Sequence, residues 1–172
     1  MTLALLVLFA LGPARADTPS IVVIETTLPD TPITTPATQM DRSQAPNSLP
    51  RVEQMLAAWH PEDLPVASDW LQVTDAAVAL IWLADHAALN RDRQRALSAL
   101  RHFEQPQAQR VLFNKALDPT LPELIRLGAL SGLRGQRLTP PMCEKLATEL
   151  QEQSALITNA AHRVTGGNAC SN

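Results

Sequence analysis

Residue types that carry out acid–base or metal chemistry are scattered in this chain. His60, Glu62 and Asp63 form one cluster that could hold a cation, but a solvated loop punctuated by Pro61 explains it more simply. No glycine-rich phosphate loop, no Cys and His set at metal-ligand spacing and no carboxylate pair occurs. We therefore expect no catalytic residue, no bound metal and no cofactor, and we do not expect an enzyme.

The chain has two cysteines, Cys143 and Cys170. Cys143 falls near the start of one expected helix and Cys170 just beyond the next, so an antiparallel hairpin would place them side by side. A protein in an oxidising compartment usually joins such a pair, which predicts a structural disulfide. Two free buried thiols are the alternative, and a redox site would lack the usual C-x-x-C spacing.

Basic side chains concentrate in the second half of the chain. Residues 17–90 hold ten acidic and two basic side chains, whereas residues 91–172 hold seven acidic and eleven basic ones. If the helices stack, Arg93 aligns with Arg126 and Arg101 aligns with Arg134; we call these four residues the arginine ladder. We predict that the ladder binds an acidic protein partner, for which the chain's own acidic half is one candidate.

Two other interpretations of the arginine ladder remain open. The four side chains would form a solvated face if they had no partner. Arg93 and Arg126 could alternatively be internal braces to carboxylates in loops.

The overall composition indicates an all-helical protein without a nucleic-acid partner. Alanine and leucine carry most of the hydrophobic content, and both favour helices, while aromatic residues make up only 3%. The net charge of −3 gives no basic excess that would attract nucleic acid.

The first sixteen residues are typical of an export signal. Residues 3–11 form an apolar run, and Ala14 and Ala16 supply small residues before a cleavage point that follows Ala16. This run is too short for a membrane span, which needs about 20 apolar residues, so no stable span is expected. The sequence predicts a periplasmic or secreted protein.

Residues 17–50 read as a disordered Pro/Thr-rich tether. They contain six prolines and seven threonines, and each proline removes a backbone donor and disfavours helix in the residue before it. From residue 51 to residue 172 the apolar residues recur at helical spacing. The predicted helices cover 51–59, 64–73, 75–89, 92–103, 106–117 and 123–134, followed by one that opens at Thr139 and Pro140 and one that Ser154 caps.

A seven-residue segment occurs twice, 33 positions apart. Residues 95–101 and residues 128–134 share five of seven residue types, and Arg93 recurs as Arg126 at the same offset. A repeat of this length is typical of stacked helix pairs, in which each pair buries its apolar face against its neighbour.

This pattern resembles the HEAT-repeat family of α-solenoids, including its short bacterial members. The likeness is carried by residues 92–100, and by residues 117–119 followed by 125–133, with Asp118 near the turn and Arg126 in the helix. The resemblance implies a right-handed stack of antiparallel helix pairs over roughly residues 90–165, a non-catalytic scaffold or adaptor that binds a protein. A compact helical bundle that acts as a periplasmic chaperone or inhibitor is the alternative.

Overall fold

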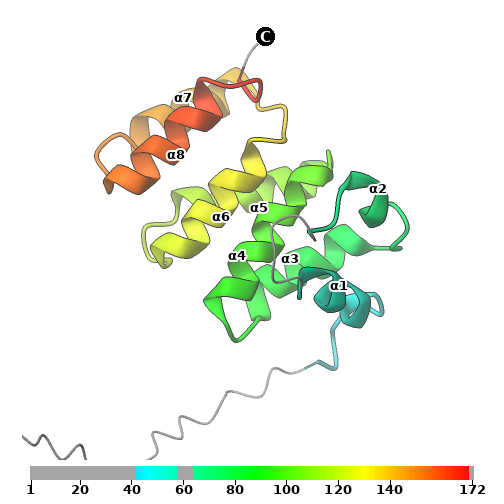
Figure 1. The fold of residues 1–172 in the computed structure, drawn as a ribbon. Helices are drawn as coiled ribbons and strands as arrows, with labels where there is room; N and C mark the ends of the chain where they lie inside the picture. Colours follow the sequence, from blue (N-terminus) through cyan, green and yellow to red (C-terminus); the bar gives the residue numbers. More distant parts are fainter. Residues whose placement is uncertain (1–41, 58–63, 171–172) are drawn as a thin grey trace, which may run out of the picture. The chain divides into compact units, whose positions relative to one another are not determined.

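The computed structural model describes residues 42–57 and 64–170, and every described element is a helix. The expected export signal (1–16), most of the expected tether and the cluster at His60, Glu62 and Asp63 lie outside the described residues. The helices are α1 (Leu49–Leu56), α2 (Ala67–Trp70), α3 (Ala76–His86), α4 (Asn90–Ala99), the 3₁₀ turn η2 (Leu100–His102), α5 (Pro106–Leu117), α6 (Glu123–Leu133), α7 (Pro140–Glu149) and α8 (Ala155–Thr165) (Figure 1).

The folded part of the chain begins before residue 51, where the sequence analysis placed its start. Helix α1 begins at Leu49, whose side chain is buried, and Ala45 also packs against the core. Pro50 permits this start because the first turn of a helix needs no intrahelical N–H donor. One of the six prolines assigned to the tether, Pro50, therefore belongs to the helix.

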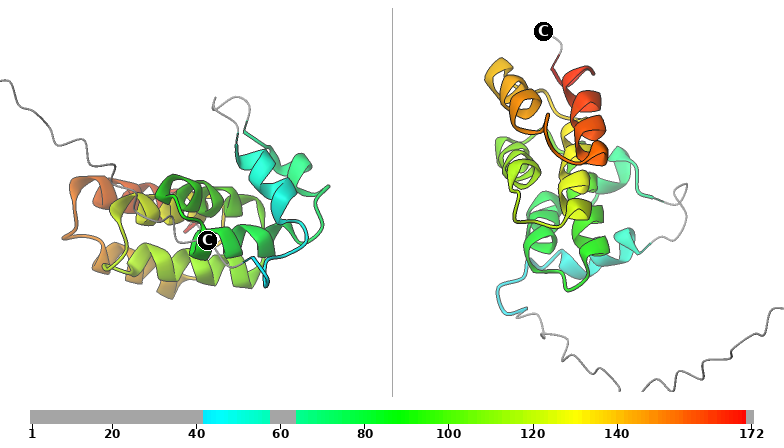
Figure 2. Two further views of the ribbon diagram at one scale, coloured as in Figure 1. Left: turned by 90° about the horizontal axis from the view of Figure 1, so that it is seen from below. Right: turned by 90° about the vertical axis from the view of Figure 1, so that its left-hand side faces the viewer.

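The helices from α3 onward are arranged in two layers. Helix α6 packs along α4 on one side and along α8 on the other, while α3, α5 and α7 form the second layer (Figure 2). Each helix of the second layer also packs against its successor in the chain, which gives the pairs α3–α4, α5–α6 and α7–α8. This packing fits a repeat stack or a bundle.

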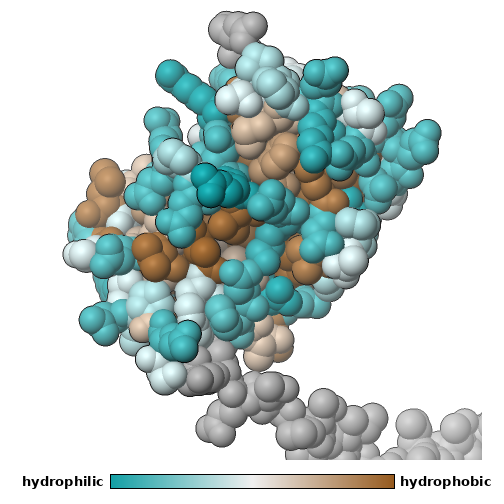
Figure 3. All heavy atoms as spheres, turned by 180° about the vertical axis from the view of Figure 1, so that it is seen from behind, coloured by the Kyte–Doolittle hydropathy of each residue, from teal (hydrophilic) through white to brown (hydrophobic). Residues whose placement is uncertain are grey.

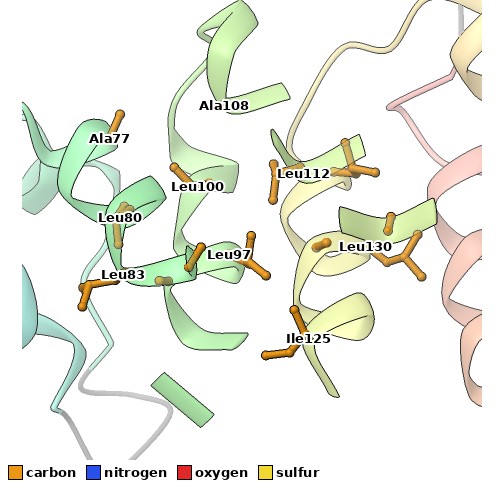
Figure 4. Close-up of a cluster of buried hydrophobic side chains, with 14 of the residues drawn as sticks. Ala77, Leu80, Leu83, Leu97, Leu100, Ala108, Leu112, Ile125 and Leu130 are labelled. Carbon is orange, nitrogen blue, oxygen red and sulfur yellow. The ribbon is translucent and has the colours of Figure 1, made fainter. Parts of the chain in front are cut away.

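Leucine and alanine side chains fill the space between the two layers. Leu97 of α4, Leu112 of α5 and Leu130 of α6 are fully buried members of one hydrophobic cluster (Figure 4). Burial of one such leucine stabilises a fold by about 1.5–3 kcal/mol. The small alanines beside them allow the helices to lie close together.

Helices α4 and α6 approach so closely that two positions of α6 require glycine. A Cβ atom at Gly128 would lie 2.7 Å from the carbonyl oxygen of Gln94, and one at Gly132 would lie 2.5 Å from that of Leu97. Both distances are shorter than a real Cβ contact allows. The second copy of the repeated segment therefore carries glycine where its backbone meets the first copy.

The two cysteines lie at disulfide-bonding distance, as the sequence predicted. Cys143 is in the first turn of α7 and Cys170 follows α8, with Cα atoms 6.0 Å apart. The amide of Leu138 donates to the carbonyl of Ala169 at 2.8 Å and joins the same two segments. The predicted cap of α8 is also confirmed, because Ser154 Oγ accepts from the amide of Ile157.

Candidate partner-binding site

Arg93 and Arg126 make equivalent contacts in successive helix pairs. Arg93 Nε donates to the carbonyl oxygen of Ala84 in α3 at 3.0 Å. Arg126 Nε donates to the carbonyl oxygen of Ala116 in α5 at 3.1 Å. Each arginine thus satisfies a carbonyl near the C-terminal end of the preceding helix, where no intrahelical donor is available.

These contacts give two members of the arginine ladder, Arg93 and Arg126, a structural role within the fold. Arg126 is only 6% exposed and also donates from Nη1 to Gln153 Oε1 at 3.1 Å. Arg93 is half-buried. They are internal braces, as one interpretation of the sequence held, but they bind backbone carbonyls and not loop carboxylates. The candidate contact surface is therefore reduced to Arg101 and Arg134.

Arg101 and Arg134 are exposed at the C-terminal ends of neighbouring elements. Arg101 lies in η2 after α4, and Arg134 directly follows α6. A Cβ at Gly135 would lie 2.6 Å from the carbonyl oxygen of Arg101, so the two backbones touch here. We call Arg101 and Arg134 the basic pair. Positive side chains at helix C-termini also interact favourably with the negative end of the helix dipole.

The basic pair differs from other basic residues in its surroundings. Lys115 pairs with Asp85 at 2.5 Å, and Arg42 pairs with Glu53 at 2.9 Å. Within residues 42–57 and 64–170, neither member of the basic pair has a carboxylate within salt-bridge distance. This part of the surface therefore presents two positive charges without neutralising partners.

A cavity of about 280 Å³ lies beside Arg101. One wall comes from Leu56 of α1, Trp70 of α2 and Leu64 in the segment before α2, and the other from α4, η2 and α6. We call it the α1–α4 cavity. Its remaining lining residues are Pro65, Gln94, Arg95, Ser98, Ala99, His102 and Ser131.

His102 lines this cavity next to Arg101. Burial, and after it the positive charge of Arg101, holds the pKa of His102 below its usual value. Arg101 Nε donates to His102 Nε2 at 3.1 Å, a contact that requires this nitrogen to carry no proton. The imidazole is therefore an acceptor for Arg101 at neutral pH, and it helps to orient the guanidinium.

Several large apolar side chains are exposed at the starts of the helices of the first layer. Leu89 precedes α4, while Leu124 and Leu156 occupy the second position of α6 and α8. Figure 3 shows apolar patches between hydrophilic side chains on the face turned away from the viewer in Figure 1. Surface of this kind can contribute apolar contact area to a protein interface.

Arg101 and Arg134 were predicted from the sequence as contact residues, whereas the cavity beside Arg101 was not predicted. Ser98 and Ser131 stand at the same place in the two copies of the repeated segment, and both line the cavity. The repeated serine was the only sequence feature that could have pointed to the cavity. The opposite wall, with Leu56 and Trp70, comes from helices outside the repeat and could not be placed from spacing.

The described residues contain no group of three or more His, Cys, Asp or Glu side chains that could hold a metal ion. Among the helices of this same part of the chain, none has the length and apolar character to cross a membrane.

The fold and the site define an all-helical protein built from packed helix pairs. Comparison with known proteins gives no match to any family model, curated protein or solved structure. The function is therefore argued from the geometry alone.

Proposed function

We propose that this protein is an exported, non-catalytic scaffold of the HEAT-like kind, which binds another protein through the surface formed by consecutive helix pairs. The observation that carries the proposal is the equivalence of Arg93 and Arg126. Two helix pairs built to one plan, with the same brace at the same place, favour a repeat stack over a bundle. Repeat stacks use their extended surfaces for binding.

The basic pair is the part of this surface that contacts the partner. Arg101 and Arg134 occupy the same place in the two copies, are exposed, and have no carboxylate partner in the described part of the chain. The partner is accordingly a protein with an acidic surface. Charge complementarity of this kind speeds association and selects among partners, and salt weakens it.

Export accounts for the cysteines in this proposal. A disulfide between Cys143 and Cys170 persists in an oxidising compartment and is rare in the cytosol. The partner would then be met in the periplasm or outside the cell.

Quantitative affinity capture tests the proposed function. The full chain is immobilised and exposed to an extract of the cells that produce it, at low salt and at about 0.5 M salt. A partner captured at low salt is expected to be lost at high salt and with the double variant R101E/R134E. The control R110E/K145E reverses two exposed charges on α5 and α7, and should retain it. Equal loss in both variants would contradict the assignment.

A further inference from the structure

The α1–α4 cavity lies where the N-terminal helices meet the two copies of the repeated segment. The C-terminal residue of α1, Leu56, and the segment that precedes α2 face α4 and α6 across it. The volume of about 280 Å³ is near the lower end of ligand pockets, so it accommodates one or two side chains and not a folded domain.

Among the described residues, the charged side chains that line the cavity are all positive. Two arginines, Arg95 and Arg101, line it, and no Asp or Glu does so among the described residues. Arg95 Nη1 donates to the carbonyl of Leu56 at 2.8 Å, which fixes the side chain while its remaining N–H groups stay available. A carboxylate suits this place, because a guanidinium binds it with two parallel hydrogen bonds.

The opposite wall of the cavity is apolar. Leu56, Leu64 and Trp70 supply this wall, so a ligand needs an apolar group next to its negative charge. Trp70 is 2% exposed, and its indole N–H has no acceptor among the described residues.

The hydroxyl groups of two serines also belong to the cavity lining. Ser98 Oγ lies at the limit of hydrogen bonding to the Gly128 carbonyl, at 3.5 Å, and Ser131 comes from the equivalent position of α6. Gln94 Nε2 donates to Ser98 Oγ at 3.3 Å. These groups suit the backbone of an extended peptide, which offers both donors and acceptors.

We propose that the α1–α4 cavity binds an extended segment of the partner protein, with an Asp or Glu carboxylate on Arg95 and Arg101 and the next apolar side chain against Leu56 and Trp70. This inference rests on the proposed function and names the part of the partner that the protein recognises. The charge complementarity of the two arginines and the apolar wall beside them select this occupant.

Binding of defined peptides by the full chain tests the inference. The probe is acetyl-Gly-Asp-Leu-Leu-Gly-amide, followed by nuclear magnetic resonance of labelled protein. We expect shifts at the amides of Ser98 and Ser131 and at the indole N–H of Trp70. The matched probes replace Asp by Asn or both Leu by Ala, and each should bind roughly tenfold more weakly, because each lacks one of the two features.

Two variants assign the binding to the cavity. S131L places a larger side chain in the cavity lining and R101Q removes one charge, and each should weaken binding of the Asp-Leu-Leu probe by roughly tenfold. T148L on the exposed side of α7 is the control and should bind normally. If S131L does not fold, R101Q alone decides the result, since Arg101 is exposed.

Three outcomes would overturn the inference. The first is equal binding of the Asp and Asn probes. The second is that the amide shifts caused by the peptide lie away from the cavity. The third is that hexanoate binds while the peptide does not, which would indicate a small carboxylic acid as the ligand. If the cellular partner is still captured by S131L but lost with R101E/R134E, the proposed function stands and the cavity is not its site.

Discussion

Arg126 repeats, 33 positions later, the contact that Arg93 makes: each guanidinium Nε donates to the carbonyl oxygen of an alanine near the end of the preceding helix, at 3.1 and 3.0 Å. The two alanines, Ala116 and Ala84, are both fully buried. A repeated contact between two copies indicates that the copies share a packing plan and not only a sequence.

The buried brace should contribute more to stability than the half-buried one. We expect R126M to lower the free energy of unfolding by about 1–3 kcal/mol, because it leaves the carbonyl of Ala116 without a donor. R93M should lower the free energy of unfolding by about 1 kcal/mol, since water can reach the half-buried site of Arg93. Urea denaturation gives both values, with R110M as the control on an exposed face. An R126M stability equal to that of R110M would show that the brace is dispensable.

The close approach of α4 and α6 predicts a strong effect of one added methyl group. G132A should destabilise the protein by about 1–3 kcal/mol, because its Cβ would lie 2.5 Å from the Leu97 carbonyl oxygen and 2.6 Å from a methyl group of Leu112. The matched control is G166A, at an exposed position after α8 where a Cβ meets only the His162 carbonyl oxygen. Thermal unfolding of the two variants should differ clearly, and equal midpoints would mean that the helices lie further apart.

Reduction of the Cys143–Cys170 bond should destabilise the α7–α8 pair. The cysteines are 27 positions apart, and closing a loop of this length stabilises a fold by about 3–4 kcal/mol on the chain-entropy model. Urea denaturation with and without reductant measures the effect, and the variant C143S/C170S is its control, because reductant should not change it. A wild-type protein whose stability is insensitive to reductant would contradict a structural role for the bond.

The pKa of His102 should lie below that of a free histidine, about 6.5. Since the folded state then binds fewer protons than the unfolded state, His102 stabilises the fold above about pH 6.5, and this contribution is lost as the pH falls through the folded-state pKa. A titration followed by nuclear magnetic resonance measures that pKa. R101Q should raise it toward the free value, because one of the two causes is removed. No change in R101Q would leave burial as the whole cause.

The helical content and the repeat could be predicted from the sequence, whereas the role of single residues could not. The helical spacing of apolar residues placed helix α5 correctly, because Pro106 and Asp118 mark its ends. The arginines at 93 and 126 were visible as a repeated pair, but spacing does not tell whether a side chain points outward or back to the previous helix. That depends on the distance between helices, which Gly128 and Gly132 set through contacts with residues about 35 positions away.

The α1–α4 cavity was beyond sequence reasoning for a similar reason. Its arginines and serines lie in the repeated segment, yet its apolar wall comes from α1 and α2, which have no counterpart in the repeat. The docking of α2 onto the stack depends on an edge-to-face contact between Trp70 and Phe103, with ring centroids 6.2 Å apart. Trp70 and Phe103 lie far apart in the sequence, so no local sequence pattern indicates that they are in contact.

Site-specific photo-crosslinking in the producing cells tests the central claim, that the surface around the basic pair meets the partner. A photoreactive residue replaces Arg137, which is exposed three positions after Arg134, and in a second strain it replaces Arg110 on α5. We predict that position 137 gives one dominant adduct with an acidic protein, that R101E/R134E abolishes it, and that position 110 gives none. An adduct from position 110 alone, or one from position 137 that survives the charge reversal, would contradict the account.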